Sequence, residues 1–114
     1  VRKLKGWSSD TQERLLNFIN NMPLWLELEN HIIVHAGISP GKHPKDCDED
    51  TLLWTRKGFI DSKTGLDKKI VYGHTPTDSR KVEFQEDKIG IDCGVYLGGP
   101  LAVLELPSEK VYYL

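Results

Sequence analysis

Two short apolar runs, each with a histidine and a glycine at its end, constrain most strongly what this chain can fold into. The first covers residues 31–35 (HIIVH) and stops at Ala36-Gly37, and the second covers residues 70–72 (IVY) and stops at Gly73-His74. β-Branched and aromatic residues in runs of this length are typical of buried strands. Because a buried strand needs cover from other elements, the pattern predicts a mixed α/β chain.

The N-terminal part is predicted to be helical over residues 8–22. A capping box fits its start, formed either by Ser9 with Gln12 or by Asp10 with Glu13, and Pro23 closes the segment. Residues 24–30 (LWLELEN) alternate apolar and polar side chains and predict an extended segment. The helix carries an apolar stripe at helical spacing, made of Leu15, Leu16, Phe18, Ile19 and Met22.

The rest of the chain reads as loops, one further helix and several strands. Residues 39–48 and 62–69 are polar connections, and we expect a short helix between them that begins at Asp48 or Asp50 and ends near Phe59. Strand-like stretches follow the second apolar run, over residues 80–84, 88–92, 101–106 and 111–114, with a tight turn at 107–110. We therefore expect an α/β fold with antiparallel hairpins at a β-rich C-terminal end.

The composition excludes several classes of protein. The chain has 114 residues, of which 15 are basic and 17 acidic, so a formal net charge of −2 argues against a nucleic-acid binder but not against binding one phosphate. No apolar run approaches the length of a membrane span. Cys47 and Cys93 are too few for a disulfide scaffold and fit no common zinc spacing. One domain in a reducing cytoplasm, with no nucleic-acid or membrane partner, is therefore expected.

The histidines that end the two buried strands, His35 and His74, are the first candidates for chemistry. If the strands pair, both imidazoles face one pocket at the strand ends, where ligands gather in open sheets. A neutral imidazole there suits a borderline metal such as Mn, Fe or Zn. A single histidine is more often a satisfied core or surface residue, and we assign His31 and His43, which lack this context, to that class.

Arg56 and Asp92 are further candidates, each with an ordinary alternative. Arg56 closes the segment LLWTR, and its guanidinium matches phosphate oxygens in a fork geometry, with Trp54 able to pack nearby. The alternative for Arg56 is a solvated ion pair on a helix surface. Asp92 either accepts a hydrogen bond from a metal-bound histidine or caps a turn. The residues alone leave both alternatives open.

Four segments, taken in order, resemble one known family: IIVHAGI (32–38), LLWTR (52–56), VYGHTP (71–76) and IGIDCGVYLGGPLAVLEL (89–106). They are similar to the C-terminal half of calcineurin-like metallophosphoesterases, and most similar to bacterial serine/threonine protein phosphatases of the phosphoprotein phosphatase type. The resemblance covers nearly all of residues 1–114. It implies that the chain forms half of the metallophosphoesterase β-sandwich, flanked by helices.

The resemblance also implies roles for single residues. The histidines of the HAG and GHTP motifs, here His35 and His74, would be ligands of one metal in a two-metal site. Arg56 would be a catalytic residue that binds the substrate phosphate, and Asp92 a catalytic-site residue beside the metals. Cys93 stands where the family commonly has threonine.

For a complete enzyme, the resemblance implies a metal-dependent phosphoric ester hydrolase. Two divalent metal ions, Mn, Fe or Zn, would provide a metal-bound hydroxide that attacks phosphorus directly. The favoured substrate is a phosphoserine or phosphothreonine protein. A dinucleoside polyphosphate hydrolase of the same family is the alternative.

The family has three further motifs before HAG that this sequence lacks: Gly-Asp-x-His-Gly, Gly-Asp-x-x-Asp-Arg-Gly and Gly-Asn-His-Glu. They would supply the other metal ligands, so we expect half a site, and Val1 as the first residue agrees with truncation. The expected partners are the missing N-terminal half of the fold and a phosphorylated protein or nucleotide substrate. Two other hypotheses stay open: a non-catalytic binding module, and a single zinc site made of His35, His74, Asp92 and Cys93.

Overall fold

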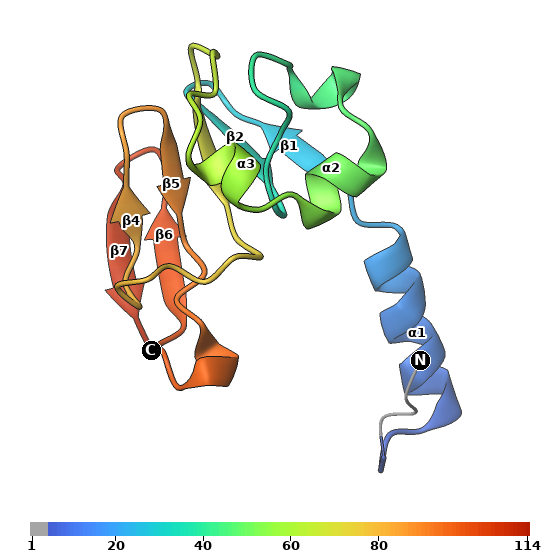
Figure 1. Cartoon of the computed structure of the whole chain (residues 1–114). Coiled ribbons are helices and arrows are strands. Elements are labelled where there is room, and N and C mark those ends of the chain that lie inside the picture. Colours follow the sequence, from blue (N-terminus) through green and yellow to red (C-terminus); the bar gives the residue numbers. More distant parts are fainter. Residues whose placement is uncertain (1–4) are drawn as a thin grey trace.

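The computed structural model describes residues 5–114 and arranges most of them in three layers, with one helix projecting to the side (Figure 1). A five-stranded sheet lies in the middle, two short helices cover one face, and a β-hairpin covers part of the other. None of the helices in residues 5–114 is both long and apolar enough to cross a membrane. The helical elements are α1 (Ser9–Asn20), η1 (Pro44–Asp46), α2 (Glu49–Trp54), α3 (Lys57–Ile60) and η2 (Val95–Leu97). The strands are β1 (Trp25–Glu27), β2 (His31–Val34), β3 (Lys69–Tyr72), β4 (Glu83–Phe84), β5 (Lys88–Gly90), β6 (Ala102–Glu105) and β7 (Lys110–Tyr113).

The five-stranded sheet is parallel in its centre and antiparallel at its edges. Its strand order is β1-β2-β3-β5-β4. β2 runs parallel to β3 with Ile33 opposite Val71, and β3 runs parallel to β5 with Val71 opposite Ile89. β1 and β4 add antiparallel to the outer sides of β2 and β5. The two apolar runs that end in histidine are therefore neighbouring parallel strands, so their carboxyl ends lie at the same edge of the sheet.

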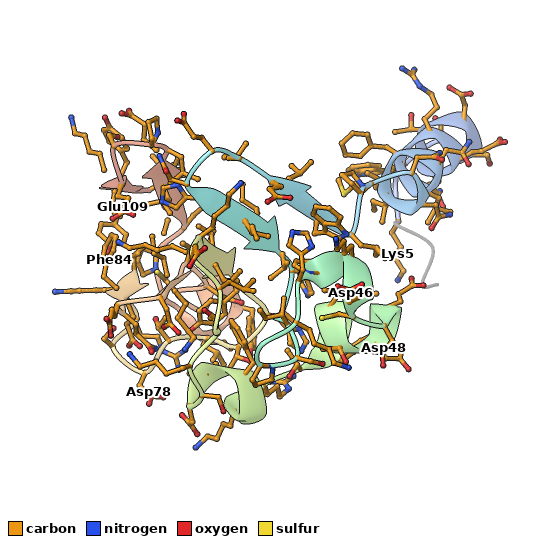
Figure 2. All side chains as sticks on the ribbon, turned by 90° about the horizontal axis from the view of Figure 1, so that it is seen from above. Lys5, Asp46, Asp48, Asp78, Phe84 and Glu109 are labelled. Carbon is orange, nitrogen blue, oxygen red and sulfur yellow. The ribbon has the colours of Figure 1, made fainter. Side chains whose placement is uncertain are left out.

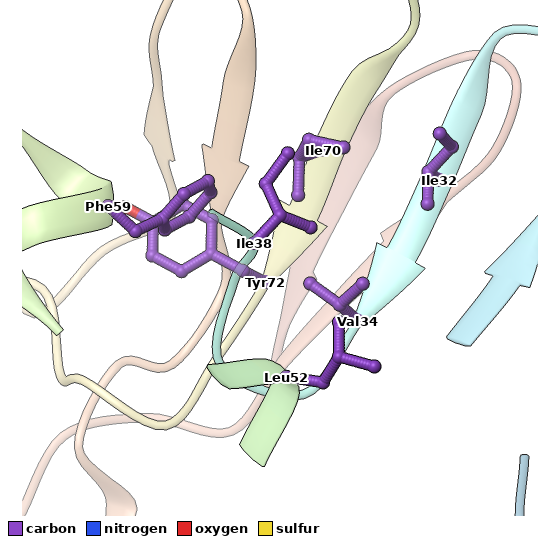
Figure 3. Close-up of a cluster of buried hydrophobic side chains, with 7 residues drawn as sticks. All are labelled: Ile32, Val34, Ile38, Leu52, Phe59, Ile70 and Tyr72. Atoms are coloured by element: carbon purple, nitrogen blue, oxygen red, sulfur yellow. The ribbon is translucent and has the colours of Figure 1, made fainter. Parts of the chain in front are cut away.

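The first face of the sheet packs against α2 and α3 (Figure 3). Side chains alternate between the two faces along a strand, so every second residue of β2 and β3 joins this layer. The Phe59 ring meets the Tyr72 ring edge to face, with 5.1 Å between centroids. These contacts fix both short helices next to the carboxyl ends of the strands. The buried cluster consists of Ile32, Val34, Ile38, Leu52, Phe59, Ile70 and Tyr72.

The second face packs against the antiparallel hairpin β6–β7, in which Val103 pairs with Tyr112. With the antiparallel pair β4–β5, this hairpin confirms the expected β-rich C-terminal end. The central residues of this layer are Val71, Val82, Ile89 and Cys93, and the hairpin adds Ala102, Leu104 and Val111.

Several predicted elements are shorter in the structure. β1 covers only part of 24–30, and the expected strands at 80–84 and 88–92 shrink to β4 and β5. The strand expected at 80–84 is shorter because Arg80 adopts a left-handed backbone (φ +57°) and its N–H donates to the Thr77 carbonyl, which makes a turn. The strand expected at 88–92 is shorter because the Asp92 carboxylate accepts the Gly94 N–H, and the chain bends there.

Helix α1 is confirmed, but its predicted capping boxes are wrong. The N-cap is Ser8, whose extended backbone (φ −63°, ψ 154°) lets its Oγ accept the Thr11 N–H at 3.2 Å. Ser9 and Asp10 are already helical and cannot cap. No residue of α1 is buried, although the apolar stripe predicted for it is present in the sequence.

Glu109, in the turn of the β6–β7 hairpin, ties the hairpin to the amino ends of β2 and β3. His31 Nε2 lies 2.9 Å from Glu109 Oε1, and Lys69 Nζ donates to both carboxylate oxygens at 3.0 and 3.1 Å. The His31 side chain is buried. The hydrogen bond with His31, followed by the one with Lys69, lowers the pKa of Glu109.

This network predicts a pH-dependent contribution to stability. Because the folded pKa of Glu109 lies below its ordinary value of 4.5, the contribution is complete above the unfolded pKa and is lost as the pH falls through the folded pKa. Glu109→Gln is expected to lower the free energy of unfolding by about 1–2 kcal/mol at neutral pH and by much less at acid pH. Denaturant titrations from pH 3 to 7 measure the difference between parent and variant. Glu105→Gln on the same hairpin is the control, and equal difference profiles for the two variants would contradict the assignment.

Candidate functional site

The two predicted histidines meet at the carboxyl edge of the sheet. His35 directly follows β2, and His74 follows β3 after Gly73. The Gly73 N–H donates to the His35 carbonyl at 2.8 Å, so the two chain segments stay paired beyond the strands. His35 Nε2 lies 3.3 Å from His74 Nδ1, and the ring centroids are 5.0 Å apart. Parallel pairing of two local motifs thus produces one site.

The two nitrogens lie at hydrogen-bond distance, and their spacing also fits a shared metal ion. Imidazole ligands lie about 2.0–2.1 Å from zinc, so two of them at angles of roughly 90–110° are themselves about 2.8–3.4 Å apart. The observed separation of 3.3 Å falls within this range. Within residues 5–114, however, no group of three or more His, Cys, Asp or Glu side chains is placed to hold a metal. The described residues therefore bring together a pair of histidines and not a complete set of metal ligands.

His74 has two unusual properties. It is a non-glycine residue with a left-handed backbone (φ +67°), a conformation that persists only where its surroundings enforce it. Its pKa is lowered, first by desolvation and then by the positive charge of Arg56 and by His35, while Asp92 acts in the opposite direction. The imidazole is therefore held neutral, which is the form that binds metals.

Buried polar atoms without hydrogen-bond partners gather in the loop after β3. In the described part of the chain, they are His74 Nε2, Thr75 Oγ1 and Arg80 Nη1. Nearly all buried polar groups in folded proteins are hydrogen-bonded, so three unpaired atoms within residues 74–80 mark a place that another group completes. Sequence reasoning did not single out Thr75 or Arg80. The polar composition of the loop is the only sequence signal that could have indicated them.

Arg56 lies in a break between two helices, and the single helix predicted up to Phe59 is wrong. The Leu52 carbonyl accepts the N–H of Ala36 at 2.9 Å, whereas a continuous helix would offer that carbonyl to Arg56. α2 therefore ends at Trp54, and α3 begins at Lys57 with Arg56 as its N-cap. The predicted start at Asp48 is confirmed, because its carboxylate accepts the Thr51 N–H at 2.7 Å.

The Arg56 side chain is exposed and takes part in no ion pair within residues 5–114. It lies near enough to His74 for its charge to lower the pKa of that histidine. Trp54 packs at the same place, with its ring edge to face on His74 and 5.5 Å between centroids. The structure thus brings Arg56 and Trp54 to the histidine pair and leaves the guanidinium available.

Asp92 lies beside the pair but makes a turn contact. Its Oδ1 accepts the Gly94 N–H at 2.9 Å, and its carbonyl accepts the Thr77 N–H at 2.8 Å. The turn-capping interpretation is therefore observed. The carboxylate also acts electrostatically on His74, and the expected hydrogen bond from a metal-bound histidine stays a prediction.

Cys93 does not join the histidines. It is buried in the layer under the hairpin, where its Sγ lies 3.7 Å from the Ile91 carbonyl. Desolvation raises the pKa of this thiol, which opposes the thiolate that zinc requires. The hypothesis of a single zinc site that includes Cys93 receives no support from this arrangement.

Comparison with known proteins identifies the fold but no family. No protein-family model and no curated protein matches this sequence. A solved structure described as a "putative diadenosine tetraphosphatase" matches with a TM-score of 0.69 and 18% identity, over 96% of this chain. The two chains share one fold. This chain spans 56% of the length of that structure, and the predicted fold class, part of a metallophosphoesterase-like α/β sandwich, is confirmed.

Proposed function

We propose that this chain supplies two metal ligands and a phosphate-binding arginine to a metal-dependent phosphoric ester hydrolase. The enzyme would belong to the calcineurin-like metallophosphoesterases. The observation that carries the proposal is the approach of His35 Nε2 and His74 Nδ1 to 3.3 Å beside an unpaired Arg56. Sequence motifs and the shared fold support the same family.

Each residue has a chemical role in this proposal. His35 and His74 would hold one of two divalent ions, Mn, Fe or Zn, and such an ion would supply Lewis-acid stabilisation of a phosphoryl group and a lower pKa for bound water. Arg56 binds the equatorial phosphate oxygens through its guanidinium fork. Asp92 acts on His74 in the direction opposite to Arg56 and accepts the Gly94 N–H of the following turn. The ligands of the second ion come from a partner half of the fold.

Two substrate classes compete. The motifs favour a phosphoserine or phosphothreonine protein, and the matched structure, by its description, favours a dinucleoside polyphosphate. The polypeptide encoded by the complete reading frame, loaded with Mn²⁺, separates them. A higher kcat/KM for a phosphoserine peptide than for diadenosine tetraphosphate supports the first class, and the reverse supports the second.

Metal binding by the histidine pair can be tested on the 114-residue chain itself. Substoichiometric Mn²⁺ is expected to broaden the ring-proton NMR signals of His35 and His74 before those of His43, which contacts Glu27 and Trp25 instead. A His43 signal that broadens equally early would overturn the metal assignment. It would then favour the non-catalytic binding module.

Arg56→Ala is expected to weaken phosphate binding by about 2 kcal/mol in the metal-loaded polypeptide, because a charged hydrogen-bonding group is lost. The fold should not change, since Arg56 is exposed. In the metal-free chain, the variant should also raise the pKa of His74, because the Arg56 charge lowers it. Phosphate competition and an NMR titration of His74 measure the two effects. Lys57→Ala, one residue away, serves as the control, and the same result for both variants would refute the role of Arg56.

A further inference from the structure

Helix α1 carries an apolar stripe that nothing in the described chain covers. Phe18 is 63% exposed, and Ile19 and Met22 are each 49% exposed. Figures 1 and 2 show the helix standing apart from the sheets. An isolated helix shorter than about 12–15 residues is marginal in water, and α1 has 12 residues. Its stability therefore requires a surface on which the stripe can pack.

The stripe continues into a groove along the edge of the sheet. The groove has a volume of about 570 Å³, and His35 is one of the residues that line it. β1 is an edge strand, and Leu24, Leu26 and Leu28 in and around it are 38%, 51% and 42% exposed. We call the α1 stripe together with this groove the α1–β1 surface. Its apolar lining includes Ile19, Met22, Leu24, Leu26, Ile33 and Leu53.

The size and character of this surface indicate a macromolecular occupant. Contiguous exposed apolar surface of this kind marks an interaction site, and the open edge of β1 can accept another strand. The groove is lined mainly by apolar side chains, with His35 and Glu49 among its few charged or polar ones. The complementary surface must therefore also be apolar.

The comparison with the matched structure indicates which occupant of the α1–β1 surface fits best. The matched structure covers 96% of this chain, but this chain covers only 56% of that structure. The matched fold thus contains a further part that has no counterpart in residues 1–114. A second copy of this chain would bring the same part of the fold again and would not supply that further part.

We propose that the α1–β1 surface is the docking surface for the polypeptide that carries the rest of the matched fold. Helix α1 packs on this partner, and the interface between the two polypeptides runs along the groove, whose lining includes His35. The proposal rests on packing and on the shared fold, and not on the proposed function. Activity therefore plays no part in its test.

Hydrogen exchange of the α1 amides tests the proposal. Exchange is measured by mass spectrometry in the 114-residue chain and in the polypeptide encoded by the complete reading frame, including any codons before Val1. In the shorter chain, the amides of residues 12–20 should exchange fast at every protein concentration. In the longer polypeptide, their exchange should be slower by roughly a hundredfold or more.

A matched pair of variants assigns the protection to the stripe. Phe18→Ser should return α1 to fast exchange in the longer polypeptide, whereas Asn17→Ser, on the polar face of the same helix, should not. Neither should change the melting temperature of the shorter chain, where no α1 residue is buried. Fast exchange in the longer polypeptide overturns the proposal, as does a reading frame that adds no further domain. Protection in the shorter chain that rises with concentration, together with a dimer mass, shows that a second copy is the occupant and also overturns it.

Discussion

Replacing His74 by asparagine is expected to remove one metal ion and more than about a hundredfold of phosphoesterase activity from the metal-loaded, complete polypeptide. His74 Nδ1 and His35 Nε2 converge at 3.3 Å, and one imidazole alone holds a divalent ion weakly. Loss of a direct ligand should exceed the 10–100-fold effect typical of the residues that only orient ligands. Asparagine is chosen because, like histidine, it tolerates the left-handed backbone at this position.

The measurements are metal content by elemental analysis and kcat/KM on a phosphate ester. His43→Asn is the control, because His43 contacts Glu27 and Trp25 and not the two paired histidines. The melting temperature of the variant 114-residue chain checks that the fold is intact. Unchanged metal content together with unchanged kcat/KM would remove His74 from the site.

Gly37→Ala is expected to destabilise the chain by about 3 kcal/mol, at the upper end of the range for overpacked cores. A Cβ at this position would collide with the Phe59 ring, 2.6 Å from its Cγ, and would lie 2.8 Å from Thr55 Cγ2. Phe59 is 1% exposed and packs against Tyr72, so the ring has no free space into which it can turn. The clash falls between His35 and the helices that position Arg56.

The free energy of unfolding from denaturant titration measures this effect. Gly58→Ala is the matched control, because a Cβ there meets nothing within 4 Å. In α3 this change should be neutral or stabilising by up to about 1 kcal/mol. Equal stability of the two variants would mean that the loop after His35 can move away from Phe59.

The histidine pair could be predicted from the sequence because each half of it is local. The runs before His35 and His74 are β-branched and short, and parallel pairing of two such strands brings their ends together. The break between α2 and α3 could not be predicted in this way. It depends on one hydrogen bond from Ala36 to the Leu52 carbonyl, which joins segments that the local pattern treats as independent.

The contrast between local patterns and contacts of distant segments also explains the other differences between the predictions and the structure. The sequence around Ser8, Ser9 and Asp10 offers several caps of similar quality, and the extended backbone of Ser8 makes it the cap that is used. The unpaired polar atoms at Thr75 and Arg80 depend on what surrounds them in space. Asp92 was predicted either to cap a turn or to accept a hydrogen bond from a metal-bound histidine; the turn is observed, and the second role stays a prediction.

The hydrogen bond between Glu109 and His31 lies at the opposite end of β2 and β3 from the histidine pair. His31 and His35 are four positions apart on one extended segment, or roughly 13 Å at 3.3 Å per residue. This distance exceeds the screening length of about 8 Å at physiological ionic strength. A change of charge at the hairpin should therefore hardly be felt at the histidine pair. A substitution at residue 109 is expected to change the acid resistance of the chain without altering the surroundings of His35 and His74.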